Sequence, residues 1–309
     1  MRIVKASEPI KVERINICIY APPGVGKTTL AFTADSPLLL DFDKGVHRAA
    51  NRKDSVQITS WNDASSMTPD DLAPYKTIIV DTAGRALDFL SADIIKGNPK
   101  AGRGDGSLTL QGFGALKGRF GIWLKMLNTF GKDVILIAHM DEQRSGDDIV
   151  ERLDVQGGSK GEIYKSVDAM GRIFIRNKER VIDFSPRENS FGKNPAGLEV
   201  LSIPDISKNP HYLAQVIAAI KDTINSLSEE QKVTQNAVEA WETAINGYTL
   251  VDEFNKHMAE IKAAPVTVQH MFTKRAKELS FTFNKELGLY QGPPPTVHEE
   301  APTMADLFK

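Results

Sequence analysis

The sequence contains very little cysteine: its 309 residues include one, Cys18. A single cysteine cannot form a disulfide within the chain, which is typical of a protein of the reducing cytoplasm. Cys18 lies within an apolar stretch, residues 15–20, that reads as a strand. We therefore interpret it as a small buried hydrophobic residue rather than as a reactive thiol.

Long apolar runs are absent as well. No segment approaches the roughly 18 consecutive apolar residues that a membrane-spanning helix needs. Residues 1–5 contain no apolar region of the kind found in signal peptides. We expect a cytoplasmic protein that has no membrane partner.

The chain also lacks a strong excess of either charge. It carries 38 Lys and Arg residues against 40 Asp and Glu residues, a formal net charge of -2 at pH 7. No global positive field attracts nucleic acid, so any binding of nucleic acid must depend on a local basic patch. The length of 309 residues suffices for one α/β core of about 200 residues and a smaller appendage.

The first two thirds of the chain alternate short apolar strands with helical stretches, which predicts a mainly parallel sheet for a core at residues 1–204. The expected strands are residues 15–20, 38–41, 56–59, 77–81, 134–139, 173–176 and 181–184. The expected helices are residues 27–34, 86–95 and 113–130. The last two strands flank residues 177–180 and predict a hairpin, which would give the sheet an antiparallel edge.

Two glycine-rich segments, residues 96–112 and 141–161, show no periodicity and are expected to be long loops. Loops of this length within a compact domain are usually functional or disordered.

Beyond Asp205 the apolar spacing is helical only and predicts a helical domain at residues 205–290. The apolar stripes are Val238, Trp241 and Ile245, then Val251, Phe254, Met258 and Ile261, then Val268, Phe272, Ala276 and Leu279. Residues 291–309 begin with a proline-rich stretch and are expected to form a disordered tail. The tail ends in Met-Ala-Asp-Leu-Phe-Lys. This ending either has no function or is a docking peptide, similar to the Asp-Leu-Phe endings that bind a sliding clamp or a single-strand-binding protein.

Residues 21–28, Ala-Pro-Pro-Gly-Val-Gly-Lys-Thr, follow an expected strand and open an expected helix, the context that a P-loop requires. The glycines let consecutive backbone N–H groups point toward a phosphate. Lys27 would place a cation between the β- and γ-phosphates, and the Thr28 hydroxyl would bind Mg²⁺. The expected nucleotide-binding residues are Gly24, Val25, Gly26, Lys27, Thr28 and Thr29.

A second acidic motif lies at residues 77–81, Thr-Ile-Ile-Val-Asp. A buried strand that ends in a carboxylate would place Asp81 beside the P-loop, where it holds Mg²⁺ through water as Walker B acids do. The alternative is that Asp81 is the N-cap of the next helix, a role that Thr82 could also fill. Given the P-loop, we prefer the metal role.

GTP is an alternative nucleotide, because Asp81-Thr82-Ala83-Gly84 has the Asp-x-x-Gly form of GTPases and Asn177-Lys178 resembles a guanine-reading motif. That motif needs a carboxylate where this chain has Arg180, which has only hydrogen-bond donors. Unpaired guanine donors would cost about 1–3 kcal/mol each. We therefore expect ATP as the nucleotide and a hairpin at residues 177–180.

With these motifs, and with residues 38–45 and 135–139, the chain resembles RecA-type ATPases over residues 12–190. It is most similar to the phage-encoded P-loop proteins, related to the Rad recombinase core, that act in single-strand annealing. The resemblance implies a RecA-like α/β core with helices on both faces of the sheet, and a small all-helical C-terminal region. Asp43 stands where the family has the glutamate that polarises the attacking water, with Asp41 as a substitute candidate. His139 matches a γ-phosphate-sensing position.

In RecA-like oligomers, whether rings or filaments, the two long loops hold single-stranded DNA. The first segment here carries five basic residues against Asp105 alone, and an aromatic residue able to stack on a base. The DNA-binding candidates are Lys96, Lys100, Arg103, Phe113, Lys117 and Arg119. A solvated surface loop remains the alternative for this segment.

Such oligomers also supply a cation in trans to the γ-phosphate, for which Lys160, Lys165 and Arg176 are equal candidates. The resemblance thus implies an ATP- and Mg²⁺-dependent homo-oligomer that binds single-stranded DNA and anneals or pairs strands. Two alternatives stay open: a replication motor or helicase loader of the same fold, and a nucleotide-gated adaptor with negligible hydrolysis.

Overall fold

The computed structural model describes residues 11–145, 148–155 and 159–293. By their internal contacts these residues divide into two compact units, with the division between Leu227 and Ser228. Among the residues described, no helix combines the length and the apolar character that crossing a membrane requires.

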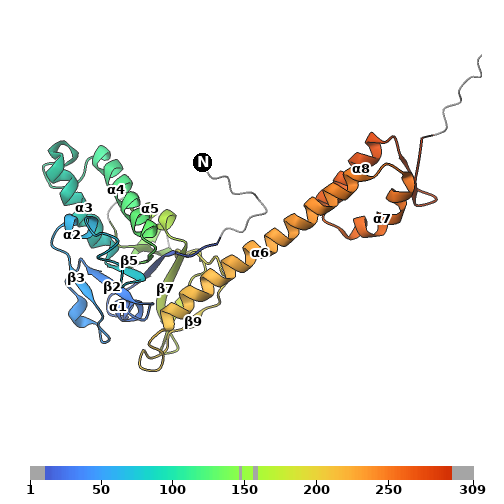
Figure 1. Cartoon of the computed structure of the whole chain (residues 1–309). Coiled ribbons are helices and arrows are strands. Elements are labelled where there is room, and N and C mark those ends of the chain that lie inside the picture. Colours follow the sequence, from blue (N-terminus) through green and yellow to red (C-terminus); the bar gives the residue numbers. More distant parts are fainter. Residues whose placement is uncertain (1–10, 146–147, 156–158, 294–309) are drawn as a thin grey trace, which may run out of the picture. The chain divides into compact units, whose positions relative to one another are not determined.

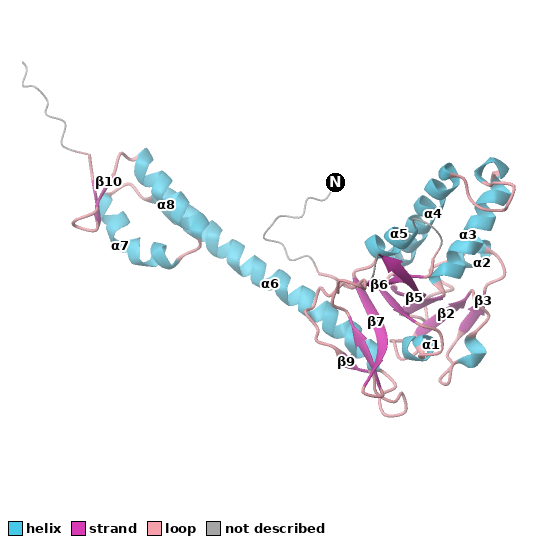
Figure 2. Cartoon of the chain, turned by 180° about the vertical axis from the view of Figure 1, so that it is seen from behind, coloured by secondary structure: helices cyan, strands magenta, loops and turns pink. Residues whose placement is uncertain are grey.

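The first unit is built on one mixed sheet (Figure 2). Its strands, in chain order, are β1 (Asn16–Ala21), β2 (Pro37–Asp41), β3 (Ser55–Gln57), β4 (Thr77–Asp81), β5 (Asp133–Ser145), β6 (Asp148–Leu153), β7 (Ala169–Arg176), β8 (Glu179–Asp183) and β9 (Leu201–Ser202). Their spatial order is β3-β2-β4-β5-β1-β7-β8-β9, and β6 pairs with β5. The strands from β3 to β7 in this order are parallel, whereas β8 and β9 add antiparallel pairs at one edge. The predicted fold class is confirmed.

Helices cover both faces of this sheet (Figure 1). They are α1 (Lys27–Ala31), α2 (Trp61–Ser65), α3 (Ala83–Gly97), α4 (Leu110–Thr129), α5 (Ser159–Ser166) and the first part of α6 (Tyr212–Gly247), with short 3-10 helices η1 (Val46–Arg48) and η2 (Pro99–Ala101). Successive strand residues point to opposite faces. Val80 therefore belongs to the cluster under α2–α5, while Ile79 belongs to the cluster under α1 and α6.

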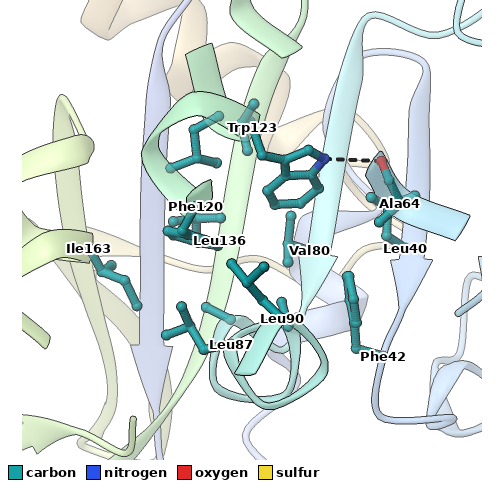
Figure 3. Close-up of a cluster of buried hydrophobic side chains, with 14 of the residues drawn as sticks. Leu40, Phe42, Ala64, Val80, Leu87, Leu90, Phe120, Trp123, Leu136 and Ile163 are labelled. Atoms are coloured by element: carbon teal, nitrogen blue, oxygen red, sulfur yellow. Dashed lines mark hydrogen bonds between the residues drawn. The ribbon is translucent and has the colours of Figure 1, made fainter. Parts of the chain in front are cut away.

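The cluster under α3 and α4 contains large aromatic side chains (Figure 3). Trp123 of α4 is buried against Phe120, and its Nε1 donates a hydrogen bond to the backbone oxygen of Ala64 at 3.0 Å. Because this bond satisfies the indole N–H, the ring can be buried without an unpaired donor. Leu87 and Leu90 of α3 belong to the same cluster as Val80 and Leu136 of the sheet (Figure 3).

The core extends further along the chain than the boundary expected at residue 204. Leu213, Val216, Ile217 and Ile220 of α6 are buried in the cluster that α1 also joins. Their spacing places them on one face of a helix, and that face covers the sheet. The change from alternating to purely helical spacing therefore precedes the division between the units, because α6 begins as part of the core.

The second unit comprises the end of α6 together with α7 (Val251–Ala263), α8 (Val266–Glu278) and a hairpin of β10 (Thr282–Asn284) and β11 (Leu289–Gln291). Phe254, Val268 and Phe272 of the predicted stripes form its core. The hairpin corrects the expectation of helices alone. Tyr290 packs on Phe254 and Phe272, with ring centroids 5.7 Å apart in each pair. The end of the expected tail, residues 294–309, lies outside the described residues.

Both glycine-rich segments contain more regular structure than expected. In the first, residues 98–109 connect α3, which continues to Gly97, with α4, which begins at Leu110; this connection contains η2 and buries Ala101 and Leu108. In the second, β5 continues to Ser145 and pairs with β6, from Met140 opposite Leu153 to Ser145 opposite Asp148. The sequence signal failed there because this hairpin carries many charged residues on both strands, which hides the apolar alternation of a strand.

Candidate nucleotide-binding site

The strand order brings the predicted residues of the nucleotide site together at one edge of the sheet. Strand β5 lies between β1 and β4, and the register aligns Ala21 with His139 and Asp81 with Ile137. Asp41 at the end of β2 aligns with Asp81. The carboxyl ends of these parallel strands surround a pocket of about 480 Å³. Eight predicted residues line it: Gly24, Gly26, Lys27, Thr28, Thr29, Asp43, Asp81 and His139.

The P-loop has the backbone conformation that its glycines permit. Gly24 and Gly26 have φ of 81° and 84°, in the left-handed region that other residues adopt only with strain. Gly26 is the N-cap of α1, which has five residues. In so short a helix the free N–H groups of the loop and first turn supply most of the attraction for an anion.

Lys27 is buried at the base of the pocket. Its Nζ donates hydrogen bonds to the backbone oxygens of Ala21 at 3.0 Å and Pro22 at 2.9 Å. Burial lowers the pKa of Lys27 to about 8, and the nearby Asp81 and Asp43 only partly oppose this shift. A polyphosphate fits beside this desolvated ammonium group and the free N–H groups of the P-loop, because it would give the ammonium an ionic partner.

Thr28 and Asp81 form the second part of the site. The Thr28 hydroxyl donates a 2.7 Å hydrogen bond to Oδ2 of Asp81. Burial raises the pKa of Asp81, and the bond from Thr28 partly offsets this. One hydroxyl and one carboxylate fit Mg²⁺, whose remaining ligands are water and substrate phosphates in such sites. Thr82, not Asp81, caps α3, since its side chain accepts the Arg85 N–H at 3.4 Å.

The two candidate aspartates for water activation have different environments. Asp41 is fully buried, and its carboxylate accepts the N–H groups of Gly45 at 3.0 Å and Val46 at 3.2 Å. Asp41 therefore shapes the loop after β2 and does not line the pocket. The Asp43 side chain is 28% exposed and does line it. Asp43 is also held by Arg48, at 2.9 Å, and approached by Arg85, at 3.7 Å.

His139 lies beside the P-loop, on β5 opposite Ala21 of β1. Its Nδ1 is 3.4 Å from Nζ of Lys27. Burial, followed by the positive charge of Lys27, lowers the pKa of His139, so the imidazole is neutral near pH 7. Strand β5 does not end at His139 as expected but continues to Ser145.

The candidate DNA-binding residues lie away from this pocket, on α3, α4 and the turn between them. Lys96, Lys100 and Arg103 are exposed. Lys117 is 3.5 Å from a carboxylate oxygen of Glu162, and Arg119 is 2.6 Å from one of Asp93. Phe113 is half-buried and packs against the cluster under α3 and α4, so only part of its ring is exposed for stacking on a base.

Two of the three trans-acting candidates have described side chains. Lys165 is exposed and lies 3.7 Å from Glu162 within α5, and Arg176 is exposed at the end of β7. Neither lines the pocket of their own chain. Lys160 lies in the first turn of α5.

Three arginines near the site were not predicted from the sequence: Arg48, which lines this pocket, Arg85, which lines the neighbouring pocket, and Arg180. The hairpin predicted at residues 177–180 is confirmed, with Asn177 and Lys178 at its tip. The same hairpin brings Nη1 of Arg180 to 3.4 Å from the backbone oxygen of Val25 in the P-loop. The sequence carries a basic residue at each position, but no motif that shows where the side chain lies.

A P-loop at the end of one parallel strand, with a buried acidic residue two strands away in the sheet, defines a P-loop nucleotide-binding protein. More particularly, residues 13–196, over half of the chain, match the model of a family of AAA domains, so the chain belongs to that family and is a P-loop ATPase. This membership implies the use of a nucleotide and, as is usual for such sites, of Mg²⁺.

Among solved structures, the chain is similar to the crystal structure of the KaiC-like protein PH0186 from the hyperthermophilic archaeon Pyrococcus horikoshii OT3. The two are 9% identical, with 64% of this chain and 99% of that chain covered and a TM-score of 0.33. No curated protein matches the chain.

Proposed function

We propose that this protein is a Mg²⁺-dependent ATPase that binds single-stranded DNA and acts in DNA recombination, as a homo-oligomer that anneals or pairs strands. The observation that carries the ATPase part is the convergence of Lys27, the Thr28–Asp81 pair and Asp43 on one pocket. The DNA-binding part is supported by three exposed cations, Lys96, Lys100 and Arg103, and by the resemblance to annealing recombinases.

Each part of the pocket has a role in ATP hydrolysis. The P-loop N–H groups and Lys27 bind the β- and γ-phosphates. Thr28 and Asp81 would hold Mg²⁺, which would neutralise charge on the phosphates. Asp43 orients the attacking water and accepts its proton, while the bond between the γ-phosphorus and the leaving β-phosphate oxygen breaks. The products are ADP and phosphate. His139, neutral near pH 7 and adjacent to Lys27, senses the γ-phosphate as a hydrogen-bond donor.

The preference for ATP over GTP rests on Arg180. Its guanidinium offers only donors, and it lies against the P-loop. Guanine needs an acceptor for its N1 and N2 hydrogens, which an arginine does not provide. A direct comparison of ATP and GTP turnover tests this preference.

In a RecA-like oligomer, a neighbouring subunit would complete the site by supplying a cation to the γ-phosphate. Lys160, Lys165 and Arg176 are the candidates to reach the γ-phosphate of a neighbouring subunit. Docking of the C-terminal residues on a single-strand-binding protein or a sliding clamp stays a prediction, as those residues are outside the described part.

The deciding experiment is ATP turnover with and without single-stranded DNA, paired with an assay of strand annealing. We expect DNA to raise turnover several-fold and EDTA to abolish it. Asp43→Asn should stop turnover but keep ATP binding, since the amide cannot accept the proton. Turnover without DNA binding at low salt would remove the recombination role. Directional unwinding in place of annealing would favour a replication motor or helicase loader.

A nucleotide-gated adaptor is the second candidate, favoured by one specific observation. Arg48 and Arg85 both lie against Asp43, so its carboxylate is occupied in this conformation. If this arrangement persists with nucleotide bound, hydrolysis is negligible and ATP acts as a ligand alone. Tight ATP binding with no turnover, whether or not DNA is present, would select the adaptor.

A further inference from the structure

Asp43 stands on the wall between two pockets. It lines the P-loop pocket and also a neighbouring pocket of about 290 Å³. Arg48 lines only the first of these and Arg85 only the second. One carboxylate is thus held by two arginines that approach it from different sides.

The two arginines are anchored differently. Arg48 ends η1, whose start is fixed because Asp41 accepts the N–H groups of Gly45 and Val46. Its side chain is 65% exposed, and beyond Asp43 it has one long contact, 3.4 Å from Nε to the oxygen of Gly45. Arg85 belongs to the first turn of α3 and also contacts Asp88 at 3.3 Å. Arg48 is therefore the more easily released of the two.

The charges of the P-loop pocket favour this release. Lys27 and Arg48 are its cations, and Asp43 and Asp81 are its anions. An exposed ion pair such as Arg48–Asp43 contributes little. A phosphate group offers the same guanidinium a bidentate, doubly charged partner. A polyphosphate in the pocket should then compete successfully with Asp43 for Arg48.

We propose that Arg48 is a nucleotide-binding residue that exchanges Asp43 for the terminal phosphate of ATP and thereby frees Asp43. The exchange rests on the proposed ATP site and names one of its ligands. It also explains how Asp43 can act in hydrolysis. Its carboxylate is paired with Arg48 before nucleotide binds, and becomes free to accept a proton once ATP has bound. ADP, which lacks the terminal phosphate, gains less from Arg48.

The test is equilibrium binding of Mg²⁺-AMP-PNP and Mg²⁺-ADP to the full chain, so that hydrolysis does not interfere. Arg48→Met should weaken AMP-PNP binding about tenfold and ADP binding about twofold. Arg85→Met is the matched control, since it removes the same charge from the same aspartate, and it should change both affinities less than twofold. Asp43→Asn should strengthen AMP-PNP binding several-fold, because Arg48 no longer has a competing anion.

The double variant Asp43→Asn/Arg48→Met decides between exchange and a general charge effect. If the exchange is real, Asp43→Asn gives no gain in affinity once Arg48 is absent. An equal gain in both backgrounds, or equal losses for Arg48→Met and Arg85→Met, would overturn the proposal. Lys27→Ala tests the ATP site separately from the exchange at Arg48. Unchanged AMP-PNP binding by Lys27→Ala would reject the ATP site itself. If Lys27→Ala loses binding but the Arg48 variants do not behave as expected, the exchange is rejected and the proposed function is retained.

Discussion

The residues predicted for the P-loop pocket form one site, whereas the residues predicted for DNA binding, around the connection between α3 and α4, do not. In the pocket, Lys27, Thr28, Asp43 and Asp81 lie at or just after the ends of β1, β2 and β4. They converge around one space with His139, which lies within β5. Around the connection, the candidate DNA-binding residues do not form such a site. Some are exposed, two are within ion-pair distance of acidic residues, and Phe113 packs on the core.

The difference lies in the kind of sequence signal. The P-loop and Asp81 carry a signal of position, at a strand end or in a loop of defined conformation, and parallel strands bring such positions together. The basic residues of α3 and α4 carry only a signal of charge along the chain. A helix distributes consecutive charges around its surface, so a count does not define a face.

The largest effect expected is for Lys27→Ala, which should lower ATP turnover by about 100-fold or more, as loss of one preorganised charge-stabilising group does. Lys132→Ala is the control. Lys132 is another buried lysine, bound to the backbone oxygens of Leu72 at 2.7 Å and Tyr75 at 2.6 Å. Its loss should reduce the free energy of unfolding by about 1–3 kcal/mol without changing turnover per folded molecule. Phosphate release measures turnover, and urea denaturation measures the free energy of unfolding. Equal losses of turnover in Lys27→Ala and Lys132→Ala would contradict a catalytic role for the P-loop pocket.

A smaller effect should distinguish the two P-loop glycines. Both have positive φ, which costs any other residue about 1–2 kcal/mol. A Cβ on Gly26 would also lie 2.5 Å from Nη1 of Arg180, so the end of this flexible side chain would have to move away from the P-loop, whereas a Cβ on Gly24 meets nothing within 4 Å. Calorimetry should show a lower ATP affinity for Gly26→Ala than for Gly24→Ala. If removing Arg180 in the Gly26→Ala background brings no recovery, the clash is not the cause.

The DNA-binding surface should show its effect in salt dependence. Replacing Lys96, Lys100 and Arg103 together by Gln should reduce the slope of log affinity against log salt by about 2, given about 0.7 per phosphate contact to a single strand. Replacing Lys117 and Arg119 should reduce it less, because both lie within 4 Å of carboxylates. Fluorescence anisotropy of a labelled oligonucleotide measures both slopes. A larger reduction on replacing Lys117 and Arg119 would indicate that α4 forms the DNA-binding surface.

The smallest effect is expected for treatment of the native protein with a thiol reagent, which would react at Cys18. This residue lies on β1, the strand that leads into the P-loop. Burial raises the pKa of the Cys18 thiol to about 12. Between pH 7 and pH 9 it should therefore stay protonated and react with a thiol reagent only after the protein unfolds. The free thiol measured in denaturant is the reference, and rapid labelling of the native protein would show that β1 opens.

Much of the fold followed from local patterns. The strand runs predicted the mainly parallel sheet, and the apolar spacing of Phe254 and Phe272 predicted the C-terminal helices. The hairpin of β5 and β6 was missed because its many charged residues hide the strand alternation. The division between the units was placed too early because the face of α6 that carries Leu213 and Ile217 packs on the sheet, a contact with no local signature.

The sequence by itself determined the P-loop, the acidic strand end at Asp81 and the class of sheet, since each depends on residues that are neighbours in the chain. Only the tertiary structure decided that Asp43 faces the pocket while Asp41 holds a loop, and that Arg48, Arg85 and Arg180 stand beside them. Such contacts join side chains from different loops and helices. Their geometry depends on strand order and packing, which no single segment encodes.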